Sequence, residues 1–154
     1  MPLLIPKPLY NDLRAHGEET YPHECCGILL GKSDTETLTV HQLIRAGNTR
    51  TDSAHNRYNI APQELIAAQR EARKQGLDII GFYHSHPDHP AQWSSTDFAE
   101  PHWFGCAYVI TSVDGDKTKG TAQITNSFLL TGTSEDDKTF VPQRIECEPP
   151  ASNE

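Results

Sequence analysis

The 154-residue sequence contains no long apolar run. A membrane-spanning helix needs about 18 or more consecutive apolar residues, and no segment of this chain offers them. The first six residues, Met1 to Pro6, are too short and too interrupted by proline for a secretory signal peptide. We therefore expect a cytoplasmic protein with no membrane partner.

Basic side chains are also scarce. Thirteen lysines and arginines stand against 21 aspartates and glutamates, which gives a net charge of −8. Phosphate backbones repel such a surface, so we expect no nucleic-acid partner.

The chain has only four cysteines, Cys25, Cys26, Cys106 and Cys147, and none of them stands in a CxxC pair. In an intracellular protein we expect free thiols that pack like small apolar residues. A catalytic cysteine with a histidine partner remains an alternative at this point.

The length suits one domain, which we place at residues 1–147, and the polar end 148–154 is expected to be a disordered tail. Helices are predicted at 8–19, before Tyr21-Pro22, and at 62–75, between Pro62 and Gly76. Strands are predicted at 25–30, 37–44, 57–60, 77–86, 105–112, 121–130 and 140–145, with a turn at Asp114-Gly115. These elements predict an α/β domain whose mixed β-sheet is flanked by helices.

Two histidines close the apolar run Ile79 to Tyr83, in the order His84-Ser85-His86-Pro87. Residues two apart on a strand face the same side, so both imidazoles can converge on one metal ion. Asp97 follows after ten intervening residues and offers a third ligand. Three protein ligands with an open fourth position are typical of a catalytic zinc site. A His-x-His pair without such company predicts little.

A zinc site that activates water needs a base, and Glu24 stands directly before the apolar strand that begins at Cys25. Taken alone, Glu24 is an ordinary exposed carboxylate. The remaining histidines have no supporting neighbours and are expected at the surface or in loops; they are His16, His23, His41, His55, His89 and His102.

Together these residues resemble the signature of the JAMM, or MPN-plus, metalloprotease family. That signature has a glutamate before a strand, then H-[ST]-H-P, six residues and S-x-x-D. The chain matches it with Glu24, His84 to Pro87, and Ser94 to Asp97, and the stretch Glu24 to Gly31 resembles compact bacterial members. The resemblance implies a single MPN/JAMM-like domain of the cytidine-deaminase-like class.

The resemblance also implies a role for each residue. His84, His86 and Asp97 bind one Zn²⁺ per chain. Glu24 takes the proton of the zinc-bound water and passes it to the leaving amine, and Ser94 donates a hydrogen bond to the developing oxyanion. Ser85 is expected to face the opposite side of the strand in a structural role.

The implied reaction is hydrolysis of a peptide or isopeptide bond after the C-terminus of a ubiquitin-like or sulfur-carrier protein that ends in Gly-Gly. Three alternatives stay open: an inactive MPN-like scaffold or protein-binding module, a cell-wall or phage-tail associated metallopeptidase, and a DNA-repair-associated relative. Intact Glu24, His84, His86 and Asp97 argue against the scaffold, and the net charge argues against direct DNA binding. The sequence does not indicate an oligomeric state.

Overall fold

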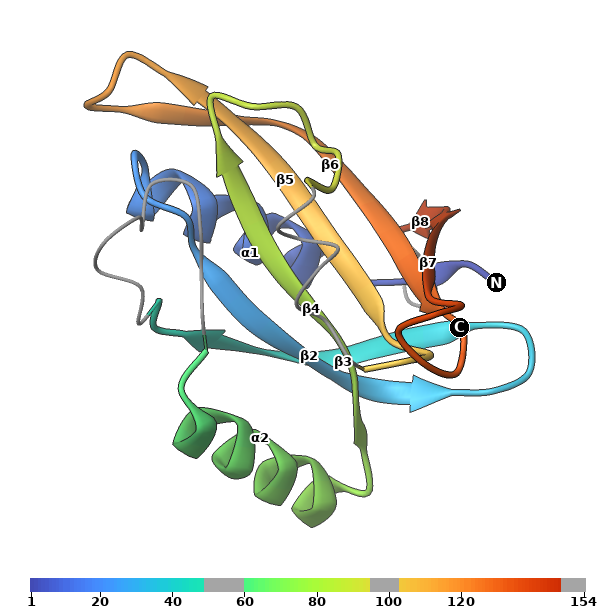
Figure 1. Cartoon of the computed structure of the whole chain (residues 1–154). Coiled ribbons are helices and arrows are strands. Elements are labelled where there is room, and N and C mark those ends of the chain that lie inside the picture. The colour runs from blue at the N-terminus through green and yellow to red at the C-terminus, as the bar shows by residue number, and fades with distance from the viewer. Residues whose placement is uncertain (49–59, 95–102, 148–154) are drawn as a thin grey trace.

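The computed structural model describes residues 1–48, 60–94 and 103–147, which form one mixed β-sheet and two helices (Figure 1). The strand order is β7-β6-β5-β4-β2-β3-β1-β8. The elements are β1 (Leu3–Leu4), α1 (Lys7–Thr20), β2 (Cys26–Ser33), β3 (Leu38–Ala46), α2 (Pro62–Gln75), β4 (Asp78–Pro87), β5 (Ala107–Gly115), β6 (Gly120–Thr131), β7 (Thr139–Gln143) and β8 (Ile145–Glu146). The sheet is mixed because β4 runs parallel to β5, whereas β2 pairs antiparallel with both β3 and β4.

The two helices cover opposite faces of this sheet. On one face, Leu13 of α1 packs into an apolar cluster that includes Leu29 and Tyr83. On the other face, Ala68 and Ala72 of α2 pack into a second cluster. Strands that are covered on both faces become apolar throughout, which explains the continuous apolar runs of β2, β4 and β5. In Figure 1, α1 passes behind β4 and β5.

The second helix has the bounds predicted from its ends. Pro62 occupies its first turn, where the missing N–H costs nothing. Gly76 ends it with a φ of 71°, in the left-handed region that glycine enters without strain. None of the helices in the described residues is long and apolar enough to cross a membrane.

Two details of the prediction are wrong. The strand expected at 140–145 breaks at Arg144, and Ile145–Glu146 pairs with β1 at the opposite edge of the sheet from β7. The turn expected at Asp114-Gly115 lies later, because Gly115 still pairs with Gly120. The chain reverses at residues 116–119, where Asp116 Oδ1 accepts hydrogen bonds from the N–H groups of Thr118 and Lys119, both at 3.0 Å.

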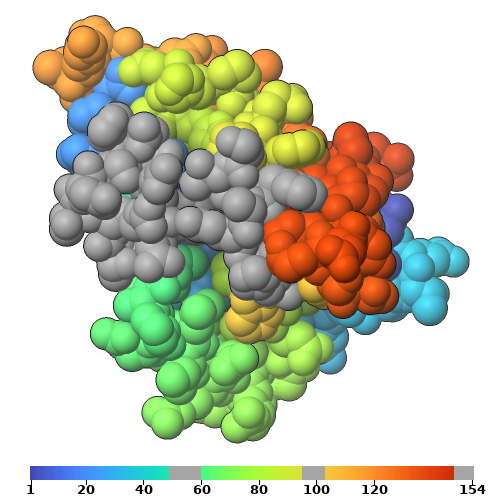
Figure 2. Space-filling view, in the orientation of Figure 1, coloured from blue at the N-terminus to red at the C-terminus, as the bar shows by residue number. Residues whose placement is uncertain are grey.

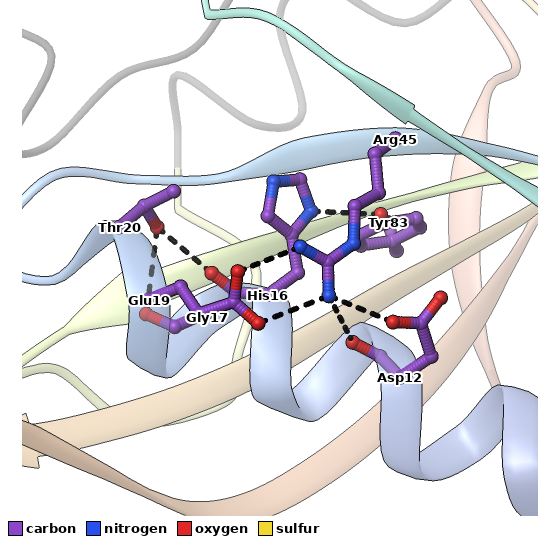
Figure 3. A network of polar contacts seen from close by, with 7 residues as sticks. All are labelled: Asp12, His16, Gly17, Glu19, Thr20, Arg45 and Tyr83. Carbon is purple, nitrogen blue, oxygen red and sulfur yellow. Dashed lines mark hydrogen bonds and ion pairs between the residues drawn. The ribbon is translucent and has the colours of Figure 1, made fainter.

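His16 is not a surface residue, contrary to expectation. It is 7% exposed, and its Nδ1 lies 2.8 Å from the hydroxyl of Tyr83 on β4 (Figure 3). Beside it, the guanidinium of Arg45 on β3 bridges Asp12 and Glu19 of α1 at 2.7 and 2.8 Å. The amphipathic helix turns this histidine toward the sheet, where its ring packs edge-on against Tyr83.

Several expectations fall on residues 49–59, 95–102 and 148–154, which lie outside the described residues. These are most of the short strand at 57–60, the expected metal ligand Asp97, and the C-terminal tail. The extent of the domain therefore stays a prediction.

Candidate metal centre and active site

The carboxyl end of β4 holds His84 and His86 near the middle of the sheet. The two side chains are 3% and 7% exposed. His84 pairs with Cys26 of β2 and with Ile110 of β5, so both flanks of the strand are fixed by main-chain pairing. As the alternation of a strand requires, the two rings share one face, and their centroids are 4.9 Å apart.

The ring nitrogens have the geometry of a ligand pair. Nε2 of His84 lies 3.2 Å from Nε2 of His86. Two nitrogens bound to one tetrahedral zinc ion at about 2.0–2.1 Å each are roughly 3.3 Å apart. The observed separation therefore fits two ligands of a common zinc ion without movement of the rings.

The tautomer of His86 fits the same role. Its Nδ1 lies 2.9 Å from the carbonyl oxygen of Pro90, which can only accept a hydrogen bond. Nδ1 of the neutral ring therefore carries the proton, and Nε2 keeps its lone pair for a metal. A carbonyl that accepts a hydrogen bond from the other ring nitrogen commonly orients a metal-binding histidine.

Glu24 is brought beside this strand. The main chains continue to pair beyond β2, because the Ser85 N–H donates to the Cys25 carbonyl at 3.3 Å. Glu24 stands two residues before Cys26, the partner of His84, at the same end of the sheet as the two histidines. Glu24 is only 4% exposed, so it is not the ordinary exposed carboxylate that the residue suggests when taken alone.

Ser85 faces the other side of β4, toward α1. Its hydroxyl accepts a hydrogen bond from the Cys25 N–H at 2.9 Å. A Cβ built on Gly17 of α1 would lie only 3.2 Å from the Cβ of Ser85, so the helix passes close over it. These contacts give Ser85 a structural role in locking β2 to β4.

The neighbouring thiols are unsuited to nucleophilic attack. Burial raises the pKa of Cys25 to about 11 and also raises the pKa of Cys26. Both are therefore protonated at neutral pH, whereas a cysteine nucleophile has to be a thiolate. The thiols act as small apolar groups in the core.

The remaining two predicted residues lie at the boundary of the described chain. Ser94 is exposed at the end of the segment 60–94, and Asp97 lies outside the described residues. Within 1–48, 60–94 and 103–147, no three His, Cys, Asp or Glu side chains form a group that could hold a metal. The structure thus brings together His84 and His86 and buries Glu24 just before β2, whereas the roles of Glu24, Ser94 and Asp97 stay predictions.

Two contacts of the loop that follows β4 were not predicted from the sequence. The Pro90 carbonyl that contacts His86 is a main-chain group, so no pattern of side chains in the sequence predicts it. Asn126, on β6, donates to the Ala91 carbonyl at 2.9 Å from 35 residues away. An asparagine within a run otherwise typical of a strand was the one available signal, since asparagine is depleted in strands.

Two relatives are identical to this chain at about a third of the aligned residues. This chain is 35% identical over 97 residues to the desampylase of Haloferax volcanii. The aligned region covers 63% of this chain and 68% of the relative. The chain is 32% identical over 113 residues to a probable TtuB-protein conjugate cleaving protease of Thermus thermophilus, covering 73% and 72% of the two chains.

A solved structure agrees over nearly the whole length. The solution structure of a protein from Salinibacter ruber superposes with a TM-score of 0.69 at 35% identity, covering 97% of this chain and 93% of the other. Residues 6–126 match the family model described as prokaryotic homologs of the JAB domain. Because that match spans well over half of the sequence, the chain belongs to the prokaryotic JAB family, the JAMM/MPN group that its motifs resemble.

Proposed function

We propose that this protein is a zinc-dependent hydrolase that cleaves the peptide or isopeptide bond after the C-terminus of a ubiquitin-like or sulfur-carrier protein. The observation that supports it most is the convergence of two buried histidine Nε2 atoms, 3.2 Å apart, in a chain of the JAB family. The names of the two relatives, a desampylase and a conjugate cleaving protease, favour a protein conjugate as substrate.

His84, His86 and Asp97 would hold the metal, one ion per chain. Two neutral imidazoles and one carboxylate are a donor set that suits Zn²⁺ and leaves a coordination position open. When bound, zinc supplies a Lewis acid that polarises the scissile carbonyl and lowers the pKa of a water molecule.

The protein's own groups manage the protons and the developing charge. Glu24 takes a proton from the attacking water and delivers it to the amine that leaves, as a positioned general base and acid. Ser94 donates a hydrogen bond to the oxyanion that forms when the carbonyl is attacked.

We further propose a substrate tail that ends in Gly-Gly and a cytoplasmic location. Glycines allow the close backbone approach that a tail needs in a narrow site. The four cysteines are free, and three of them are buried, which suits a reducing compartment.

The test is a carrier protein fused through its terminal Gly-Gly to a short extension. The zinc-loaded enzyme is incubated with this fusion, and the products are weighed by mass spectrometry. We expect one cut after the second glycine, lost on addition of a chelator and restored by zinc. A matched fusion with Ala-Ala at the junction is the control. Fusions of several carriers that all remain uncut would overturn the proposed substrate.

Metal analysis separates the enzyme from an inactive scaffold. The enzyme should purify with, or tightly take up, one zinc per chain, and Asp97→Ala should weaken zinc binding. A chain without zinc affinity and without chelator-sensitive activity would support the scaffold. Unchanged zinc affinity in Asp97→Ala would remove Asp97 from the ligand set.

A further inference from the structure

The loop that follows β4 is tied to the β5–β6 hairpin where it begins. Asp88 adopts a φ of 58°, a left-handed conformation that aspartate tolerates better than most residues. Its N–H donates to the Val113 carbonyl at 2.7 Å. Its carboxylate accepts from the Gly115 N–H at 2.9 Å and from the Tyr21 hydroxyl at 2.7 Å. The start of the loop is thereby fixed against the end of β5.

A second tie holds the middle of the same loop. The side-chain amide of Asn126, on β6, donates to the carbonyl of Ala91 at 2.9 Å. Ala91 is 4% exposed and packs into the apolar cluster of Ile110 and Phe128. Figure 2 shows the loop, in yellow-green, on the surface beside the orange tip of the β5–β6 hairpin.

The carbonyl that Asn126 binds is adjacent in the chain to the carbonyl that contacts His86. The Pro90 carbonyl accepts from Nδ1 of His86 at 2.9 Å, and the next carbonyl, that of Ala91, accepts from Asn126. The peptide that joins Pro90 to Ala91 is planar, so only φ and ψ of Ala91 separate the two carbonyl groups. Few torsions therefore separate the amide of Asn126 from the oxygen that orients His86.

We propose that Asn126 is a positioning residue of the hydrolytic site. It holds the Pro90–Ala91 main chain in place, so that the Pro90 carbonyl fixes the ring of His86 and the loop delivers Ser94 three residues later. This inference rests on the proposed function, since it assigns a role in zinc binding. Loss of a group that hydrogen-bonds a metal ligand costs roughly 10–100-fold in metal affinity or activity. Asn126 contacts His86 only through the Pro90–Ala91 main chain, so we expect the lower end, about tenfold weaker zinc binding.

The decisive variant is Asn126→Asp. It keeps the shape of the side chain, removes the N–H donor and turns an oxygen toward the Ala91 carbonyl. Gln123→Glu is the matched control, because it also converts an amide to an acid on β6, at an exposed residue whose amide donates to Thr121 of the same strand. Asn126→Ala removes the donor without adding charge, and it replaces the aspartate variant if that protein does not fold.

Three measurements are made on the full chain: the zinc dissociation constant by competition with a chromophoric chelator, the visible spectrum of the Co²⁺-loaded protein, and the melting temperature of the metal-free protein. We expect about tenfold weaker zinc binding and an altered Co²⁺ spectrum for Asn126→Asp, and wild-type values for Gln123→Glu. Asn126→Gln, which retains a donor, should recover part of the affinity.

The outcomes distinguish this inference from the proposed function. Zinc affinity and Co²⁺ spectrum equal to wild type in Asn126→Asp would overturn the positioning role alone. A lower melting temperature with unchanged zinc affinity and spectrum would likewise overturn it and assign Asn126 to stability only. A wild-type protein that binds neither zinc nor Co²⁺ would overturn both proposals.

Discussion

Glu24 is buried rather than exposed, two residues before the strand partner of His84, and its proposed role as base can be tested by one substitution. Glu24→Gln keeps the size of the side chain but cannot accept a proton. We expect zinc binding close to that of wild type and turnover of the carrier fusion lower by about 10²–10⁴-fold, the usual contribution of a general base. Zinc titration and a cleavage time course measure the two quantities separately.

Glu18→Gln is the control for that variant, since Glu18 lies on α1, away from the histidine face, and its carboxylate accepts from the Ala122 N–H. It should leave turnover unchanged. Full activity in Glu24→Gln would remove Glu24 as the base.

At the residue scale, the sequence predicted what local geometry dictates. A His-x-His pair on a strand must present both rings to one face, and the structure has them there. The contribution of Asn126 was not predictable in this way, because it depends on how β6 lies against the loop after β4, a contact across 35 residues. Asp97 was predicted from spacing and remains a prediction.

At the scale of the elements, the close contact of β2 and β4 depends on Gly27. A Cβ at this position would lie 2.1 Å from Cε2 of Tyr83, well inside van der Waals contact. Tyr83 cannot withdraw easily, since it is 1% exposed and in contact with His16. Gly27→Ala should therefore destabilise the fold by roughly 1–3 kcal/mol, the cost of overpacking a core.

Urea unfolding of the metal-free protein measures this cost. Gly47→Ala is the matched control, because the nearest atom to its added Cβ would be a carboxylate oxygen at 3.9 Å, an ordinary contact. The two alanine variants should differ clearly in their unfolding midpoints. Equal midpoints would mean that Tyr83 relaxes freely and that Gly27 is not required for packing.

Some elements are determined by local sequence signals, whereas others are determined only by pairing with distant strands. The helix at 62–75 was predicted to the residue, because Pro62 and Gly76 mark its ends locally. The two-residue strands β1 and β8 were missed, since they exist only through pairing with each other and, for β1, with β3. No periodicity can develop over two residues, so only the assembled sheet defines them.

For the whole molecule, the α/β class was expected from the predicted elements, and the JAMM family and its hydrolase activity from the motifs. The family match and the relatives confirm these expectations. The topology explains why so local a signature suffices. β4 lies inside the sheet between β2 and β5, so the histidine strand and the segment with Glu24 are neighbours by main-chain pairing. The two histidines are thus carried by a strand that is paired on both sides.

The stability of the whole fold should depend on pH through His16. Burial lowers the pKa of His16 from its ordinary value of 6.5, and the positive charge of Arg45 lowers it further, while Glu19 and Asp12 oppose the shift. Tyr83 also faces the ring (Figure 3), and it is neutral because burial raises its pKa. The folded protein therefore binds fewer protons at this site than the unfolded chain. The stabilisation is complete above pH 6.5 and is lost as the pH falls from there toward the lowered pKa of the folded state.

Urea unfolding of the metal-free protein at pH 7.5 and pH 5.5 tests this dependence. His16→Gln should be less stable than wild type at pH 7.5, because it loses the buried ring, yet it should lose less stability between the two pH values. All other side chains are common to both proteins, so their contribution cancels in the comparison. Tyr83→Phe removes the hydrogen bond but keeps the buried imidazole, and it should retain the pH dependence of wild type. If His16→Gln and wild type lost the same stability on acidification, the dependence would arise elsewhere, and the buried histidine would serve only to pack α1 against the sheet.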